Sequence, residues 1–170
     1  MNSNSCIGGF VIKKTNTLGE IMEKYPEVAP VLASAGLHCI GCHVSTYESI
    51  GDGCLSHGMN KKEVDELIKK ANARIREYDK LAQVTFTTGA FDELNKRLVA
   101  SKEKFVRVTQ NFGEFDFQTT NKKEKGEIEL QVKGGAGKIV VLLPIRTERL
   151  LRGVKIDFDK KLKDFSASRI

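Results

Sequence analysis

Four residues in the first half of the chain have types and spacing suited to thiol or metal chemistry. Cys39 and Cys42 are separated by two residues, and Cys54 and His57 repeat that spacing further along the chain. Two cysteines spaced in this way can form a disulfide or hold one metal ion, and Gly41 gives the backbone between them the freedom to bring them together. Three thiolates with one imidazole suit tetrahedral zinc, and three thiolates alone can hold an iron-sulfur cluster. We therefore take Cys39 and Cys42 as candidate catalytic residues, and all four residues as candidate metal ligands.

Other interpretations of the thiols and imidazoles stay open. Cysteine is among the residue types most often buried, so each thiol can be a small apolar core residue, and Cys54 can face inward from its helix. His38 and His43 flank the cysteine pair and can lower thiol pKa values without ligating a metal. Cys6 lies in the N-terminal segment and receives no assigned role.

Short helices are expected before the segment of residues 38–44, which contains Cys39 and Cys42 and is called the cysteine loop below. Thr17 and Glu20 form a capping-box pattern that predicts a helix over residues 18–24. Pro26 suits the first turn of a second helix, which Gly36 is placed to end in the left-handed conformation. The apolar residues of both helices recur at steps of three and four, which predicts one shared core.

Two further helices are expected after the loop. Ser45 is predicted to cap a helix that begins at Thr46, which would place Cys42 just before a positive helix end and favour its thiolate. Asn60 opens a second capping-box pattern, and a long helix with one apolar face is predicted to end near Lys80.

The first half of the chain resembles a known domain family over about residues 12–75. The residues that carry the resemblance are Thr17-Leu18-Gly19-Glu20-Ile21-Met22, Tyr25-Pro26-Glu27, Val31-Leu32, Gly36-Leu37, His38-Cys39-Ile40-Gly41-Cys42 and Cys54-Leu55-Ser56-His57-Gly58. They resemble the hybrid-cluster-protein-associated redox disulfide domain, a small helical domain of anaerobic prokaryotes. The resemblance implies a redox-active cysteine pair in a domain whose activity is not established.

Residues 81–170 carry the alternating apolar pattern typical of strands. The strand segments lie around Val84, Phe105, Phe115, Ile128, Lys138 to Leu143 and Val154, with one helix capped by Thr88 and a short one through Leu150. The run from Gly134 to Gly137 predicts a hairpin turn between two strands rather than a phosphate loop. We expect an α+β fold, with a small all-α domain over residues 1–80 and a mixed, mainly β domain over residues 81–170.

The order of elements in the second half resembles the A-type iron-sulfur carriers, which have the HesB-like fold. The resemblance covers about residues 83–166 and includes the motif Gly-x-x-Ile-Asp-Phe from Gly153 to Phe158. Those carriers hold their cluster with cysteines, whereas residues 81–170 contain none. The resemblance therefore implies the fold without its usual cluster site, and a role in docking or dimerisation.

Composition limits the partners and the location. The chain has 28 Lys plus Arg against 22 Asp plus Glu, but basic residues alternate with acidic ones, as in Lys122-Lys123-Glu124-Lys125, which argues against nucleic-acid binding. The longest apolar run, Ile139 to Leu143, is too short to cross a bilayer. With no secretory signal pattern, we expect a cytoplasmic protein whose thiols start out reduced.

These observations favour one function and leave two alternatives. The first is thiol-disulfide exchange, with Cys42 attacking and Cys39 resolving, linked to iron-sulfur or anaerobic redox metabolism. The second is a carrier of an iron-sulfur cluster or zinc that uses Cys39, Cys42, Cys54 and His57. The third is a non-catalytic adaptor with structural cysteines, so enzymatic activity is left undecided. In each case the second domain is expected to bind a protein partner or a second copy in a homodimer.

Overall fold

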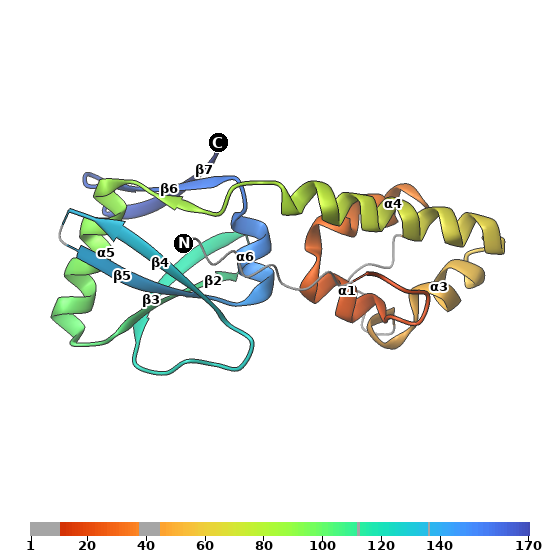
Figure 1. Ribbon diagram of the computed structural model, residues 1–170, viewed down its shortest axis with the longest axis horizontal. Coiled ribbons are helices and arrows are strands. Elements are labelled where there is room, and N and C mark those ends of the chain that lie inside the picture. Colours follow the sequence, from red (N-terminus) through yellow and green to blue (C-terminus); the bar gives the residue numbers. More distant parts are fainter. Residues whose placement is uncertain (1–10, 38–44, 112, 136) are drawn as a thin grey trace, which may run out of the picture. The chain divides into compact units, whose positions relative to one another are not determined.

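A computed structural model describes residues 11–37, 45–111, 113–135 and 137–170 of the chain. The chain divides into two compact units, Met1–Lys80 and Leu81–Ile170, which are described separately. The first unit is helical and the second combines two sheets with two helices (Figure 1). The predicted α+β fold class is therefore confirmed.

The first unit consists of short helices followed by one long helix. Its elements are α1 (Leu18–Lys24), the 3-10 turn η1 (Pro26–Val28), α2 (Ala29–Ser34), the 3-10 turn η2 (Ser45–Tyr47), α3 (Ile50–Ser56) and α4 (Lys61–Asp79). The capping boxes predicted at Thr17 and Asn60 are both formed. Gly36 has a φ of 87°, which is the left-handed conformation predicted for the end of α2.

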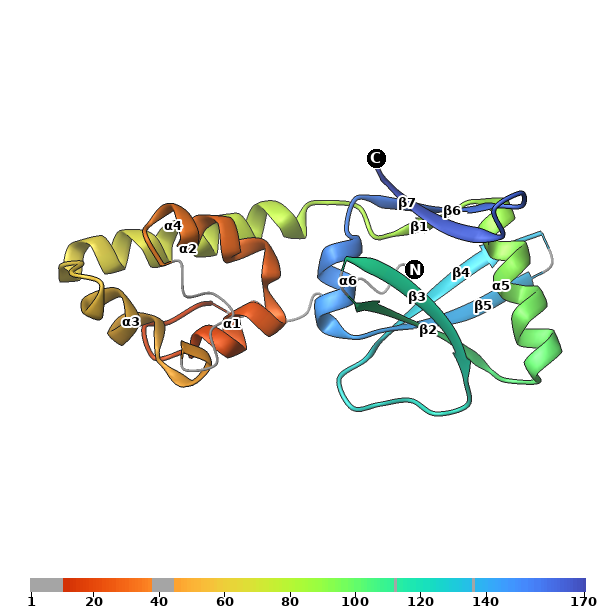
Figure 2. The ribbon, with the colours of Figure 1, turned by 180° about the vertical axis from the view of Figure 1, so that it is seen from behind.

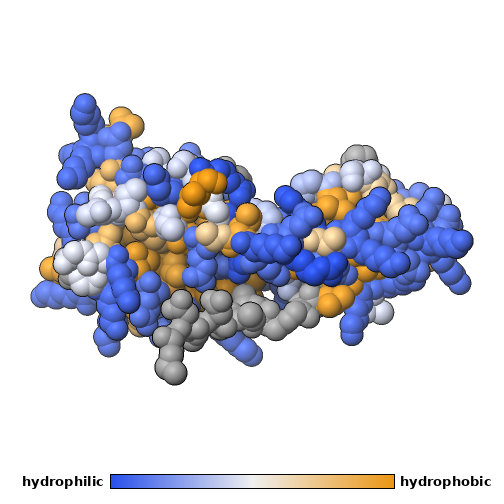
Figure 3. Space-filling view, turned by 45° about the horizontal axis from the view of Figure 1, so that its top comes forward, coloured by the Kyte–Doolittle hydropathy of each residue, from blue (hydrophilic) through white to orange (hydrophobic). Residues whose placement is uncertain are grey.

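The core of the first unit lies under the apolar face of α4. Val64, Leu67, Ala71 and Ile75 recur at helical spacing on that face, and they pack against buried residues of α1, α2 and α3. The other face of α4 is charged, and hydrophilic residues dominate the visible surface of the helical unit in Figure 3. Burial of one aliphatic side chain contributes about 1.5–3 kcal/mol, so packing of this face against the other helices stabilises the unit.

The second unit holds its strands in two sheets. Its elements are β1 (Thr85–Phe86), α5 (Thr88–Ser101), β2 (Phe105–Asn111), β3 (Glu114–Thr120), β4 (Ile128–Gly134), β5 (Gly137–Leu143), α6 (Ile145–Leu151), β6 (Val154–Asp159) and β7 (Asp164–Arg169). The strand orders are β1-β6-β7 and β3-β2-β5-β4 (Figure 2). In the described residues of the chain, no helix is long and apolar enough to cross a membrane.

Aromatic side chains join the elements of the second unit. Phe91 of α5 is almost fully buried at 1% exposure and lies against Gly134 at the end of β4. Phe117 of β3 stacks on Phe165 of β7, with 4.2 Å between the ring centroids, so the two sheets meet at this pair. The predicted hairpin is confirmed, because Gly134 pairs with Gly137 across the β4–β5 turn.

Two details of the second unit differ from the sequence-based expectation. Thr87 caps α5 in place of Thr88: its hydroxyl accepts from the Ala90 N–H at 3.2 Å and donates to Asp157 at 2.5 Å. The hydrogen bond from Thr87, followed by the one from the Phe158 N–H, holds the pKa of Asp157 below its usual value. Strand β7 was not predicted, because most of its side chains are exposed and polar or small and so show no apolar alternation.

Candidate functional site

The predicted reactive cysteines belong to a segment that the structure does not describe. Cys39 and Cys42 lie outside the described residues, as do Cys6, His38 and His43. Their assignment as a dithiol or as metal ligands therefore stays a prediction. The described residues do define the two ends of the cysteine loop and the surroundings of Cys54 and His57.

Both ends of the cysteine loop are packed in place. Before the loop, Leu37 is buried in the core, and its N–H donates to the Leu32 carbonyl at 3.1 Å. After the loop, η2 lies directly on α1, because a Cβ placed on Gly19 would be 2.6 Å from the Thr46 methyl carbon Cγ2. Glycine permits this close approach, although it is unfavourable within a helix. The fold therefore holds the loop ends through the core and through one glycine contact.

The helix expected after the loop begins later than predicted. Helix α3 starts at Ile50, and Ser49 is its N-cap, accepting from the Asp52 N–H at 3.1 Å. Only the three-residue turn η2 occupies the predicted start at Thr46. The prediction that a helix begins at Thr46, directly after the cysteine loop, is therefore wrong. Because helix-dipole effects fade within one turn, the sequence argument that favoured the Cys42 thiolate loses its basis.

Cys54 is a free thiol in the core of the first unit, with 0% of its surface exposed. Burial raises the pKa of this thiol, and the nearby negative charge of Glu48 raises it further. The Glu48 carboxylate itself accepts a hydrogen bond from Ser56 Oγ at 3.2 Å on the same helix, α3. Cys54 is therefore a protonated core residue, in agreement with the alternative that it faces inward.

His57, in contrast to Cys54, is exposed. It is the C-cap of α3, its side chain is exposed, and its backbone N–H donates to the Gly53 carbonyl at 3.2 Å. Cys54 and His57 are thus close in sequence but occupy the core and the surface. Among the residues with described positions, no group of three or more His, Cys, Asp or Glu side chains could hold a metal ion. A ligand set that joins Cys54 and His57 to the loop thiols stays a prediction.

A groove of 430 Å³ adjoins the start of the cysteine loop. Its lining is mainly polar, and it combines the apolar residues Val31, Ala35, Met59 and Leu67 with His57 and with charged residues of α4. Ala35, which lines the groove, precedes the loop by three residues. The groove therefore lies beside the described residues that lead into the loop.

The second unit contains a cluster of charged residues, Arg107, Glu124 and Glu127, that stabilises the fold. Arg107 of β2 bonds to Glu127 through Nε at 2.6 Å and to the Lys122 carbonyl at 2.9 Å. Burial alone would raise the pKa of Glu127, but hydrogen bonds from Arg107 and from the Glu124 N–H hold it below its usual value. These bonds fix the connection between β3 and β4, so the cluster needs no ligand to account for it.

The sequence contains signals for two supporting residues that were not singled out. Gly19 stands in the first turn of a helix, where glycine costs about 1 kcal/mol relative to alanine, so its presence points to a close backbone contact. Asn72 interrupts the apolar face of α4, and its side chain holds the backbone of Ile12 through two hydrogen bonds. Both residues act by positioning the segments around the cysteine loop and α3.

The first unit is thus a small helical domain whose sequence includes the cysteine loop. A family model described as a domain of unknown function, DUF1858, matches residues 12–68. The matched segment contains the loop, Cys54 and His57, and it fits the small N-terminal domain; the family description assigns no activity. No curated protein matches the chain. The HesB-like resemblance of the second half has no support from a family match and stays a prediction.

The burial of the Cys54 side chain can be tested by thiol labelling. In a variant with Cys6, Cys39 and Cys42 replaced by serine, we expect iodoacetamide to label the remaining thiol at least about 100-fold more slowly in the native protein than in urea, because labelling requires opening of the core. Equal labelling rates in the two conditions would contradict the buried position. The readout is the mass increase of the intact chain over time.

The raised pKa of Cys54 also gives a pH dependence. The unfolded thiol loses its proton near pH 8.5 whereas the folded one keeps it, so stability falls as the pH rises above about 8.5. Relative to Cys54→Ala, which lacks this group, the parent should lose more unfolding free energy between about pH 8 and pH 10. Urea denaturation at both pH values measures the difference, and parallel losses in the two proteins would argue against it.

Proposed function

We propose that the helical unit is a dithiol redox module in which Cys39 and Cys42 carry out thiol-disulfide exchange. The observation that supports this most is the burial of Cys54, which leaves the third candidate thiolate ligand of a metal site protonated in the core. A dithiol needs only the two loop cysteines, whereas a three-thiolate site needs Cys54 as well. The resemblance to a redox disulfide domain supports the same choice.

The exchange needs the two thiols of the loop and one disulfide of the substrate. One loop thiolate attacks a sulfur of the substrate disulfide, forming a mixed disulfide and releasing one substrate thiolate. The second loop thiolate then attacks the loop sulfur of the mixed disulfide, and the other substrate sulfur leaves as a thiolate. The substrate gains two electrons, and Cys39 and Cys42 end as a disulfide. Run in reverse, the same steps oxidise a substrate dithiol.

A protein disulfide is the proposed substrate class. The groove combines apolar residues such as Val31 and Met59 with polar and charged residues, so it offers contacts both to the side chains and to the backbone of a peptide segment. A segment seated there would present a neighbouring disulfide to the start of the loop. We further propose that the cysteine-free second unit serves association rather than chemistry, and that the pathway belongs to iron-sulfur or anaerobic redox metabolism.

Iron-sulfur or zinc binding through Cys39, Cys42, Cys54 and His57 is the competing proposal. It requires Cys54 to lose its proton, either inside the core or after leaving it, since thiolates are the ligating form. Metal analysis and a visible spectrum of protein purified without oxygen test it. Stoichiometric iron or zinc that is lost in Cys54→Ser would replace the dithiol proposal.

The dithiol proposal predicts a defined titration. When the full chain is equilibrated with glutathione mixtures and then alkylated, we expect two thiols to disappear together in the parent and in Cys54→Ala. The Cys39→Ser/Cys42→Ser variant should lose none, and its reduction of a test disulfide should fall by at least about 100-fold, because neither step of the exchange remains. A loop pair that stays reduced in every mixture would refute the proposal, and the Cys54→Ala chain serves as the matched control.

A further inference from the structure

Strand β7 presents an open edge. In the described part of the chain it pairs with β6 alone, and Ser166, Ala167, Ser168 and Arg169 are all exposed. Its pairing with β6 runs without interruption from Asp164 to Arg169, so no bulge turns the edge away. The strand also contains no lysine or proline, the residues that commonly protect exposed edges.

The other strand edges are protected by comparison. β1 has only two residues. β3 carries the acidic side chains of Glu114 and Asp116, and the Glu129 side chain of β4 forms an ion pair with Lys123 at 2.6 Å. Short strands and charged side chains are the usual means of preventing edge-to-edge association. The two charged residues of β7, Asp164 and Arg169, lie at its ends and leave the middle of the strand uncharged, so β7 is the edge most suited to accept another strand.

The hydrogen bonds of β6 determine which groups of β7 face outward. The Thr87 N–H donates to the Ile156 carbonyl at 2.9 Å, so the backbone of Ile156 faces β1 rather than β7. Ala167 is the β7 partner of Ile156, and since it receives no bonds from that residue, its own N–H and C=O point to the open edge. By the alternation of a strand, Phe165 and Arg169 also face outward.

We propose that β7 pairs with β7 of a second copy of this chain, antiparallel about a two-fold axis at Ala167. A two-fold axis perpendicular to a continuous sheet sets residues on the same face opposite each other, so the register must centre on a residue. With Ala167 at the centre, Phe165 lies opposite Arg169 of the second copy, and all the outward-facing groups are paired. This inference concerns the second unit and does not depend on the dithiol proposal.

The side chains fit this register better than its alternatives. Ser166 lies opposite Ser168 of the second copy on one face, and small side chains meet at the axis, so no like charges face each other. Centring on Arg169 would oppose two guanidinium groups. Centring on Phe165 or Ser166 would leave the outward groups of Arg169 unpaired, and centring on Ser168 would leave those of Phe165 unpaired. Within one copy, the Phe165 N–H already contacts the Asp164 carboxylate at 2.8 Å, so this donor exchanges one acceptor for another on pairing.

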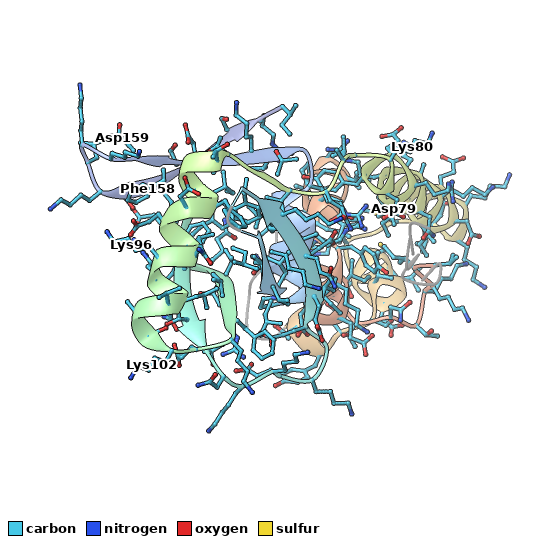
Figure 4. All side chains as sticks on the ribbon, turned by 60° about the vertical axis from the view of Figure 1, so that its left-hand side comes forward. Asp79, Lys80, Lys96, Lys102, Phe158 and Asp159 are labelled. Atoms are coloured by element: carbon cyan, nitrogen blue, oxygen red, sulfur yellow. The ribbon has the colours of Figure 1, made fainter. Side chains whose placement is uncertain are left out.

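The β6–β7 hairpin is held rigid enough to act as a template. Asp159 Oδ1 accepts from the N–H groups of Lys161 and Leu162 at 2.7 and 3.1 Å, which fixes the turn after β6. Asp159 and Phe158 are seen at this end of β6 in Figure 4. The Phe158 and Phe165 rings lie 5.0 Å apart, which ties the two strands together. A strand that is already ordered loses less entropy on pairing than a flexible one.

The size of the edge predicts a weak dimer. Pairing of two six-residue strands buries less than the roughly 1,200 Å² typical of stable complexes, so we expect association in the range of about 10 μM to 1 mM. Sedimentation of the full chain over this range should show a rise in mass from 18.9 kDa toward twice that value. A chain that stays monomeric up to 1 mM would overturn the proposal.

Ala167→Pro is the sharpest variant. Proline removes the N–H at the axis, but this donor faces away from β6, so the fold of each copy should be retained and association should weaken at least about 10-fold. Ser168→Pro is the matched control for the direction in which the N–H groups point. The Ser168 N–H faces β6, so its loss should lower the melting temperature. Unchanged association in a folded Ala167→Pro chain would overturn the proposed strand pairing.

A charge exchange at the axis tests the register itself. Ala167→Lys and Ala167→Asp each place two like charges opposite each other in a homodimer, so each variant alone should be monomeric where the parent associates. An equimolar mixture should form a heterodimer, because the introduced ammonium then faces the introduced carboxylate. Homodimers that persist in both variants, or a mixture that remains monomeric, would overturn the Ala167-centred register.

Discussion

Replacing Gly134 by alanine is expected to destabilise the second unit by about 2–3 kcal/mol, the upper range for overpacking a core. A Cβ at Gly134 would overlap the ring of Phe91, on which the end of β4 rests. The ring has 1% exposure and belongs to the central core cluster, so it cannot turn aside without displacing its neighbours. The free energy of unfolding from urea denaturation, followed by the circular dichroism of the full chain, measures the loss.

The neighbouring glycine provides the matched control. A Cβ at Gly135 would have no atom within 4 Å, so Gly135→Ala should change stability by less than about 0.5 kcal/mol. Phe91→Leu should cost less in the Gly134→Ala background than in the parent, because the smaller side chain relieves the overlap. If the two changes were strictly additive, or if both glycine variants behaved alike, contact between Gly134 and Phe91 would not be the cause.

The parts of the fold that depend on residues close together in the sequence could be predicted. Thr17 and Asn60 each satisfy backbone N–H groups within three residues, so their capping boxes can be recognised without knowledge of the rest of the fold. The same holds for Gly36, whose positive φ ends a helix locally. Apolar spacing likewise located the face of α4, because helical geometry alone sets that period.

The parts that depend on distant contacts could not be predicted. Ser45 and Ser49 are both suitable caps, and Ser49 is used because it also bridges to Thr17 and bonds to Asp52. Strand β7 has no apolar alternation, and it forms because β6 offers a free edge beside it. The need for glycine at position 134 comes from Phe91, which lies more than forty residues away in the sequence.

The candidate site shows the same division between local and distant effects. The spacing of Cys54 and His57 correctly places them about one turn apart on a helix, but spacing alone does not determine which side of the helix faces the core. The core includes Cys54 because α3 packs on α4, and the carboxylate of Glu48 then raises the pKa of the thiol further. A ligand-like pattern in sequence therefore contains one residue whose environment favours the neutral thiol.

Replacing Asn72 by alanine is expected to destabilise the first unit by about 2–4 kcal/mol, since each unsatisfied buried backbone group costs about 1–3 kcal/mol. Asn72 Oδ1 accepts from the Ile12 N–H at 2.8 Å, and Nδ2 donates to the Ile12 carbonyl at 3.0 Å. Ile12 is 1% exposed, so water cannot replace these bonds without opening the core. Asn16→Ala is the control, because its amide bonds are exposed and their loss should cost about 1 kcal/mol or less.

Removal of the Asn72 hydrogen bonds should also increase the rate at which the Cys54 thiol is labelled. The segment that follows Ile12 bonds to the start of α3, where the Gly51 N–H donates to the Lys14 carbonyl at 2.9 Å. If Asn72 holds this segment in place, Asn72→Ala should speed the labelling of Cys54 by about 10-fold for each 1.4 kcal/mol lost, because opening of the unit exposes the thiol. A large loss of stability with no change in labelling would mean that Cys54 is reached by a local opening that does not involve Asn72. Faster labelling in proportion to the lost stability would show that this one amide maintains the burial on which the assignment of Cys54 rests.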